Sequence, residues 1–370
     1  MQPTEAILED DTVLVPNEAE ASRLHSKGHF GVPQSGGPLR LHLLEAIYLV
    51  EKERISVHSP PDDKDGPAGP IVDLGEILIR AVKAIPSFEV RFSVYSDLRD
   101  RGYLIASPLL LARADGKVPE WDLEAFQRGT NPGGASKPDM RVFSLSERSE
   151  LVMGDLIVKV QAAAQNTRRT LIALVDEEGD ATYYEVETSE PIGQISSTPK
   201  GRYEGQLLED RIVITGKDAH ALYENGYFGK PSSGSLQLSF LEAAFLLEKG
   251  ILEVKNARTG KSVGHKAFLK IARERQSEFD GRLQAYTDLR NKGLVVKTGF
   301  KYGTHFRVYQ GAPSNTHARF LMHAVPKDYI TTWPELSRAV RLAHGVRKEI
   351  LFSRVLPDRM EYIEFKRVRP

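Results

Sequence analysis

The pattern of apolar and polar residues predicts a chain of amphipathic helices and short strands. Apolar residues recur at near-helical spacing between positions 39 and 50, after a turn-forming GVPQSGG, which predicts an amphipathic helix. Phe306 and Val308 alternate with Arg307 and Tyr309. Alternation of this kind predicts a strand, with Phe306 and Val308 on one face and Tyr309 beside Arg307 on the solvent-facing side.

Several short motifs occur twice along the chain, in the same order. GHFGVP at 28–33 returns as GYFGKP at 226–231, LEA at 44–46 returns at 241–243, and YSDLR at 95–99 returns as YTDLR at 286–290. Near the two ends, Tyr183 and Glu185 match Tyr362 and Glu364. Ordered matches indicate an internal duplication. We therefore expect an α+β fold made by tandem duplication of one unit, in which the repeated Gly, Pro and Leu positions serve turns and cores.

The repeats predict a division of the chain. We expect an N-terminal tail over 1–10, a first unit over 11–195, a linker over 196–206 and a second unit over 207–370. Each unit should contain an N-terminal α/β subdomain (about 11–94 and about 207–285) and a C-terminal mixed-sheet subdomain (about 95–195 and about 286–370). Stretches rich in Gly and Pro predict loops at 59–70 and 129–138.

Composition narrows the class of protein. The chain has 370 residues, a formal net charge of zero and 41% hydrophobic residues, which suffices for a core and favours two or more domains. It has no cysteine, which excludes thiol catalysis, disulfides and Cys-based zinc sites. Its apolar runs are too short to span a bilayer, and the N-terminus lacks the basic and apolar regions of a signal peptide. We expect a soluble intracellular protein.

The distribution of charge points to an anionic partner for the second unit. Residues 286–309 contain five Lys or Arg and one Asp, a local excess in a neutral chain. The first unit differs: after Tyr95 it runs through an apolar segment at 109–111, and we expect the basic, aromatic strand to be missing there. It carries instead an acidic turn at 176–180. These differences predict that the two copies have different roles.

Three side chains of the second unit have the chemistry for cleaving RNA: Tyr309, His317 and Lys348. Such cleavage needs a base for the 2′-hydroxyl proton, an acid for the 5′-leaving oxygen and a cation near the phosphorane. Histidine suits acid catalysis because its pKa lies near neutrality, and lysine supplies a fixed charge. Tyrosine is a poor base unless nearby cations lower its pKa.

Spacing alone leaves alternatives open. A strand-end tyrosine such as Tyr309 is often a half-buried packing residue, and Lys348 could be a solvated charge at a helix end. Three other histidines compete with His317 for the role of acid: His305, His323 and His344.

The second unit resembles the archaeal tRNA-splicing endonucleases. The resemblance is carried by YTDLRNKGLVVKTGFKYGTHFRVY, by the His eight residues after its last Tyr, and by RLAHGVRKEILF. The first unit resembles the degenerate, structural copy of the same family, which retains an acidic turn and final strand, here VDEEGDATYYEV. Nearly the whole chain is covered, as in the family's fused, two-unit, homodimeric type, and the mixed-sheet subdomains correspond to its nuclease subdomain.

The resemblance implies site residues and an activity. Tyr309 is implied as general base, His317 as general acid and Lys348 as stabiliser of the transition state. In the first unit Arg169 stands opposite Lys348, and we expect no chemistry from that unit. The implied reaction cuts precursor tRNA at both intron boundaries within a bulge–helix–bulge motif, leaving 2′,3′-cyclic phosphate and 5′-hydroxyl ends.

The resemblance also implies partners. Two cuts at fixed spacing suggest a homodimer. Its acidic turn, through Asp176, Glu177, Glu178 and Asp180, should dock in a basic groove on the other chain. Arg341 and Arg367 are candidates to hold a bulged base. No metal, cofactor, membrane or DNA is expected, and the location implied is cytoplasmic.

One alternative from another class remains open. A structured-RNA-binding protein without catalysis would explain the basic segment and the duplication, but not why Tyr309, His317 and Lys348 all match the family. A cleavage assay separates the two hypotheses.

Overall fold

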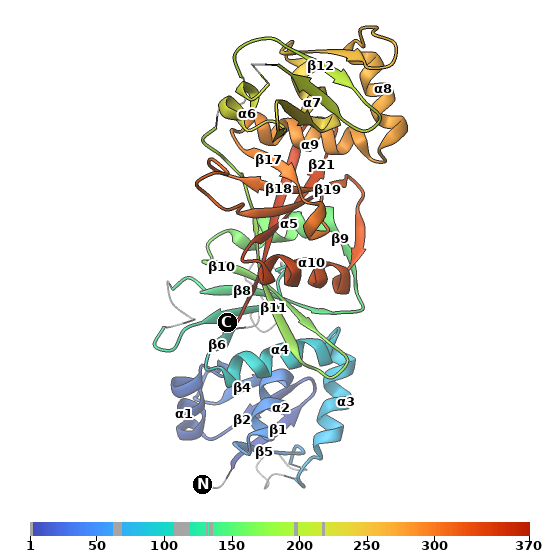
Figure 1. Cartoon of the computed structure of the whole chain (residues 1–370). Coiled ribbons are helices and arrows are strands. Elements are labelled where there is room, and N and C mark those ends of the chain that lie inside the picture. Colours follow the sequence, from blue (N-terminus) through green and yellow to red (C-terminus); the bar gives the residue numbers. More distant parts are fainter. Residues whose placement is uncertain are drawn as a thin grey trace. The chain divides into compact units, whose positions relative to one another are not determined.

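The computed structural model describes residues 3–61, 69–106, 119–130, 132, 136–195, 199–216 and 219–370. Parts of the predicted loops at 59–70 and 129–138 and of the predicted linker at 196–206, together with the apolar run at 109–111, lie outside these ranges. The chain divides into two compact units (Figure 1): unit 1 contains residues 1–149, 159–186 and 367–370, and unit 2 contains residues 150–158 and 187–366.

Unit 1 begins with a five-stranded sheet in the order β3-β4-β2-β1-β5. Its strands are β1 (Thr4–Glu9), β2 (Thr12–Val15), β3 (Val32–Pro33), β4 (Leu39–His42) and β5 (Ile55–His58). The helices of this half are α1 (Glu18–Gly28), α2 (Leu43–Glu51) and α3 (Leu74–Ala84).

Two predictions are corrected here. The expected tail over 1–10 is wrong, because residues 4–9 form β1, in which Ala6 and Leu8 are buried at 0% and 3% exposure. The helix predicted from the spacing between 39 and 50 starts only at Leu43, because residues 39–42 form β4. The polar His42 then caps α2 in a capping box with Glu45, which sets the start of the helix.

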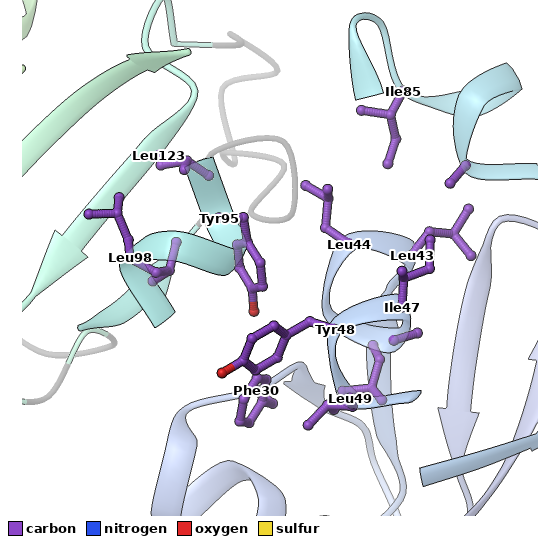
Figure 2. Close-up of a cluster of buried hydrophobic side chains, with 14 of the residues drawn as sticks. Phe30, Leu43, Leu44, Ile47, Tyr48, Leu49, Ile85, Tyr95, Leu98 and Leu123 are labelled. Carbon is purple, nitrogen blue, oxygen red and sulfur yellow. The ribbon is translucent and has the colours of Figure 1, made fainter. Parts of the chain in front are cut away.

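The second half of unit 1 packs a helix, α4 (Phe88–Asp100), on a sheet of order β6-β7-β8-β10-β11. The strands are β6 (Leu104–Ala106), β7 (Leu123–Phe126), β8 (Met140–Ser146), β10 (Arg169–Val175) and β11 (Ala181–Thr188). Figure 2 shows how the two halves of the unit meet: Tyr48 of α2 lies edge-on to Tyr95 of α4, with ring centroids 5.8 Å apart.

Unit 2 repeats both halves. The first half has the strand order β14-β15-β13-β12-β16, and the second has β17-β18-β19-β21-β22. The strands are β12 (Tyr203–Leu207), β13 (Ile212–Thr215), β14 (Lys230–Ser232), β15 (Ser235–Leu238), β16 (Leu252–Asn256), β17 (Val295–Thr298), β18 (Phe306–Tyr309), β19 (Phe320–Pro326), β21 (Glu349–Val355) and β22 (Met360–Val368). The helical elements are α6 (Ala221–Gly226), α7 (Phe240–Glu248), α8 (His265–Arg275), α9 (Phe279–Asn291), η1 (Phe300–Tyr302) and α10 (Trp333–Gly345).

The identical order of strands confirms the α+β fold and the tandem duplication. The described residues contain three further elements. The strands β9 (Glu150–Val152) and β20 (Ile330–Thr332) form a short two-stranded sheet, and the helix α5 (Met153–Ala164) follows β9 along the chain. The strand β12 begins at Tyr203, inside the segment predicted as linker.

The repeated motifs are structural in both units. Arg99 and Arg290, the last residues of the YxDLR motifs, are 7% and 1% exposed. Their guanidinium groups donate to the carbonyls of Gly28 (2.7 Å) and Gly226 (2.9 Å), so each motif ties its helix to the glycine turn of the same unit. Each arginine also lies 4.1 Å from the ring centroid of the phenylalanine that follows that glycine by two residues. The expectation that the repeated positions serve turns and cores is confirmed for these residues.

Candidate active site

The strand β18 has the faces that alternation predicted. Phe306 and Val308 are 4% and 0% exposed, whereas Arg307 and Tyr309 are half-buried. Val296 opposite Val308 and Val295 opposite Tyr309 set the register with β17. Tyr309 is therefore the last residue of β18, at the end of the strand where the loop 310–319 begins.

The sheet brings the ends of three strands together. In order, β18 is antiparallel to β19, with Val308 opposite Phe320, and β19 is parallel to β21, with Phe320 opposite Glu349. Arg319 connects the row, because its N–H donates to the Val308 carbonyl (3.0 Å) and its own carbonyl accepts from the Glu349 N–H (3.1 Å). Along the chain, Tyr309 directly follows Val308 and Lys348 directly precedes Glu349. His317 lies two residues before Arg319.

His317 is presented by a hydrogen-bonded turn. The carbonyl of Ala312 accepts from the N–H of Asn315 (3.0 Å) and from the N–H and hydroxyl of Thr316 (2.9 Å each). Ala318, on the other side of His317, is buried at 5% exposure. The imidazole of His317 is exposed, with the hydrogen-bonded turn before it and the buried Ala318 after it.

Lys348 enters β21 directly from a sharp turn. Arg347 has a left-handed backbone, with φ 56°, which is costly for a residue with a Cβ. The N–H groups of Arg347 and Lys348 donate to His344 (3.0 Å) and Ala343 (2.9 Å), which closes α10. The turn sets the direction in which the lysine leaves the backbone.

The aromatic ring of Tyr302 lies between two cations. The Lys348 ammonium is 5.9 Å from the ring centroid, and the Arg307 guanidinium carbon is 5.8 Å from it. The Lys348 ammonium also donates to the Val346 carbonyl at 3.3 Å. Sequence reasoning did not single out Tyr302, although the KYG of the long motif contained it.

The surroundings of the three strand ends are strongly cationic. Residues 289–327 contain seven Lys or Arg and no Asp or Glu. Three of these cations are ion-paired with acids from elsewhere in the chain: Lys292 lies 3.2 Å from Asp288, Lys297 lies 3.0 Å from Glu242, and the Arg319 Nε lies 2.8 Å from Glu349. The Nη2 of Arg319 lies 3.7 Å from Glu364. Burial, and then the charge of Glu349, raise the pKa of Glu364 to about 8. Glu364 therefore tends to remain protonated and neutral next to the cationic region.

The first unit lacks the three side chains, and strand register shows what replaces two of them. Leu104 pairs with Phe126 as Val295 pairs with Tyr309, so Phe126 occupies the tyrosine position. It is 3% exposed and has no hydroxyl. The expectation for the first unit is corrected in part: β7 is the counterpart of β18, so a strand is present, but it contains no Lys or Arg and its basic character is missing. A sequence signal was available, because Phe126-Gln127 matches Tyr309-Gln310.

The partner assigned to Lys348 is also corrected. Met140 pairs with Arg169 as Phe320 pairs with Glu349, so Arg169 corresponds to Glu349 and Arg168 occupies the lysine position. Arg168 is ion-paired with Asp139 at 3.6 Å, and Arg169 is ion-paired with Glu185 at 3.0 Å.

The acidic turn is the tip of the β10–β11 hairpin. The Asp176 carboxylate accepts from the N–H groups of Glu178 and Asp180, at 3.0 Å each, and Gly179 supplies the left-handed φ of 87°. Glu177 is ion-paired with Arg148. All four acids are exposed, but Asp176 also holds the turn together, so the four are not equivalent.

Unit 2 contains a basic cavity of about 700 Å³, between its two halves. The cationic side chains among its lining residues are Arg211, Lys230, Arg275, Arg282 and Lys297. Two of them are neutralised, since Lys297 lies 3.0 Å from Glu242 and Arg211 lies 2.7 Å from Asp210. The Nε of Arg282 is buried and has no hydrogen-bond partner within the described residues. With more Lys and Arg than acidic side chains in its lining, the cavity favours an acidic group.

The two candidate base-holding arginines lie on different elements. Arg341 is exposed on α10, two turns before Lys348. Arg367 is exposed near the end of β22, in the segment 367–370 that belongs to unit 1. Their joint role as a clamp stays a prediction.

Within the described residues, no group of three or more His, Asp or Glu side chains is arranged to hold a metal ion. None of the helices in the described ranges combines the length and apolar character needed to cross a membrane.

Comparison with known proteins places the site in a family. The family model "tRNA intron endonuclease, catalytic C-terminal domain" matches residues 279–365, which include the three strand ends. The model "tRNA intron endonuclease, N-terminal domain" matches twice, at 4–65 and 203–269, in agreement with the duplication.

Full-length relatives are named tRNA-splicing endonuclease. The protein from Methanococcoides burtonii is 38% identical, over 97% of this chain and 98% of its own. The protein from Methanosarcina acetivorans is 36% identical, over 98% and 99%. The protein from Haloferax volcanii is 32% identical, over 94% of each chain.

Proposed function

This chain belongs to the tRNA intron endonuclease family, and on that premise we propose that it cuts precursor tRNA at both intron boundaries within a bulge–helix–bulge motif. The observation that carries the proposal is the arrangement of Tyr309, His317 and Lys348 at the same end of three neighbouring strands. Adjacent strands lie about 4.8 Å apart, so side chains from these ends can reach one phosphate. The stretch that contains them is the one that the catalytic-domain model matches.

The proposed chemistry is a transesterification within the RNA. The 2′-oxygen attacks the adjacent phosphorus, the bond from phosphorus to the 5′-oxygen breaks, and the products are a 2′,3′-cyclic phosphate and a 5′-hydroxyl. Tyr309 accepts the 2′-hydroxyl proton, and His317 donates a proton to the departing 5′-oxygen. Lys348 stabilises the extra charge on the phosphorane. Because these side chains supply the base, the acid and the cation, the reaction needs no metal ion.

The surroundings support each assignment. Seven cations and no acid between residues 289 and 327 make the region attractive to a phosphodiester backbone. Arg307, on the same face of β18 as Tyr309, adds a positive charge to the strand that carries the proposed base. The hydrogen bond from Lys348 to Val346 and the ring of Tyr302 hold the ammonium at the strand end.

A homodimer would provide the second active site. In the first unit, Phe126 stands where the second has Tyr309, so each chain contributes one set of catalytic side chains. We propose that the acidic turn of one chain docks in the basic cavity of unit 2 of the other. The exposed carboxylates of the turn and the cationic side chains that line the cavity are complementary in charge.

The test is cleavage of a bulge–helix–bulge RNA in the presence of EDTA. We expect cuts at both bulges, with cyclic-phosphate ends that resist a phosphatase until acid opens the ring. Binding without cleavage would favour the non-catalytic RNA-binding protein instead. Cleavage that requires added Mg²⁺ would contradict the metal-independent mechanism.

A further inference from the structure

Phe300 is held in solvent beside the candidate active site. Its side chain is 86% exposed, the highest value among the large hydrophobic residues of the described ranges. Moving a phenyl ring out of water is favourable in free energy. A ring that is exposed to solvent in this way therefore offers a surface to a partner.

The loop that carries Phe300 is closed by its own hydrogen bonds. The N–H of Tyr302 donates to Gly299 (2.7 Å), and the N–H of Gly303 donates to Phe300 (3.1 Å). Thr304, 7% exposed, donates from its hydroxyl to the Phe306 carbonyl at 3.3 Å and fixes the loop to β18.

Gly299 is required in this loop, because a Cβ there would lie 2.3 Å from the Thr304 hydroxyl. The backbone under the phenyl ring is therefore fixed before any partner binds, and binding would cost little ordering of the chain.

The same loop reaches the catalytic candidates. Two residues after Phe300, the ring of Tyr302 contacts Lys348 and Arg307. On the other side, a Cβ on Gly303 would lie 3.9 Å from the side chain of Leu342, a 44% exposed residue that follows Arg341. Phe300 thus projects from the β17–β18 connection, whose Tyr302 lies near Lys348 and whose Gly303 lies near Leu342 of α10.

We propose that Phe300 is a stacking platform for an unpaired base of the RNA substrate, next to the phosphate that is cut. The inference rests on the proposed function and adds a base-binding residue separate from Arg341 and Arg367. Unpaired bases are commonly held by stacking on aromatic side chains. Phe300 lies within the segment 289–327, which has seven Lys or Arg and no acid and suits a polyanion.

A protein partner fits these observations less well. A protein-binding surface needs a larger apolar area than the Phe300 ring and the nearby Leu342 side chain supply.

The first experiment measures RNA affinity in a background that cannot cut, Lys348→Ala. Adding Phe300→Ala should weaken binding of the bulge–helix–bulge RNA by about tenfold or more, since stacking on one aromatic residue has an effect of that order. Phe300→Tyr and Phe300→Trp should bind as the background does, because they keep a ring. Ile79→Ala, which removes another exposed apolar side chain (57%) in unit 1, is the matched control and should change nothing.

Salt dependence separates stacking from phosphate contact. Phe300→Ala should lower affinity without changing the slope of log K against log salt, whereas the neighbouring Lys301→Ala should reduce that slope. RNA carrying 5-iodouridine at each bulge position in turn should photocrosslink to Phe300 from one position only.

Unchanged affinity in Phe300→Ala, or loss that Phe300→Trp does not restore, would overturn the proposal. So would a loss of affinity caused by dissociation of the protein into single chains, because the ring would then be a protein contact. Failure of the proposed function is distinguishable: the otherwise unaltered chain would then not cut the RNA, whereas the binding comparison can be made without cleavage.

Discussion

The backbones of Gly193 and Gly293 cross so closely that neither can carry a side chain. A Cβ on Gly193 would lie 2.1 Å from the carbonyl oxygen of Gly293, and a Cβ on Gly293 would lie 2.9 Å from that of Gly193. Around this crossing the segment 192–195 bonds to the second half of unit 2: Gly193 N–H to Lys292 (2.9 Å), Ile195 N–H to Gly293 (2.9 Å) and Gln194 N–H to Gln310 (3.0 Å). Gln310 directly follows Tyr309, so the segment between the copies supports the candidate site.

Gly193→Ala should therefore impair catalysis by displacing the backbone next to Tyr309, and not by removing a contact with the RNA. The added methyl group must push the two backbones apart, and we expect a loss of about 1–3 kcal/mol in the free energy of unfolding, measured by urea denaturation. The cleavage rate should fall more than the RNA affinity, because the displaced residue adjoins Tyr309. Gly281→Ala is the matched control: its Cβ would meet only Val355 at 3.9 Å, and alanine favours the helix α9. Equal losses in both variants would contradict the argument.

Substitution of the three candidate catalytic side chains should reduce cleavage while RNA affinity persists. Tyr309→Phe, His317→Ala and Lys348→Ala should each lower the single-turnover rate by about a hundredfold or more. His344→Ala, which removes another exposed histidine, should leave the rate unchanged. Normal cleavage by two of the three variants would refute the site.

Reversing charge on the acidic turn should weaken the proposed dimer. The double variant Glu178→Lys, Asp180→Lys is preferable to changes at Asp176, which holds the turn through two backbone hydrogen bonds. We expect the dimer dissociation constant to rise by about tenfold or more in sedimentation experiments, and Arg275→Glu in the partner cavity to restore part of the loss. Asp358→Lys, in the corresponding turn of the second copy, is the control. A double variant that stays dimeric at high salt would exclude docking by charge.

The raised pKa of the Glu364 carboxyl predicts that the free energy of unfolding depends on pH. Its pKa is raised from an ordinary 4.5 to about 8 in the folded chain, chiefly by burial and then by Glu349. The folded state therefore holds a proton that the unfolded chain releases above 4.5, so this stabilisation is complete at lower pH and is lost as the pH rises through 8.

Compared with Glu364→Gln, which stays neutral, the unaltered chain should lose up to about 1.4 kcal/mol per pH unit across that window. Urea unfolding of both proteins between pH 5 and 8 measures the difference. Parallel stability curves would contradict the shift.

Local patterns predicted much of the second unit. Alternation over 306–309 predicted β18 and its faces, and those residues form it. The repeated motifs predicted the duplication, which both strand orders confirm. Each of these signals is contained in a few neighbouring residues, where side-chain period and turn chemistry act directly.

The wrong predictions concern features that depend on residues far apart in the sequence. The strand β7 was missed because residues 107–118 interrupt the match between the copies before Phe126 is reached. Arg169 was paired with Lys348 because sequence comparison cannot resolve a shift of one residue, whereas strand register can. The tail expected over 1–10 is wrong because residues 4–7 pair with β5, well along the chain, and Ala6 and Leu8 are buried.

By itself, the sequence determined that the chain is a duplication with one cationic and one acidic copy, because charge, turn residues and apolar period are properties of short segments. Only the tertiary structure decided that the ends of β18, β19 and β21 meet, that Phe126 fills the tyrosine position of the first unit, and that Gly193 must cross Gly293. Strand pairing and backbone packing join residues far apart in the chain, and no local pattern specifies which residue will lie opposite which.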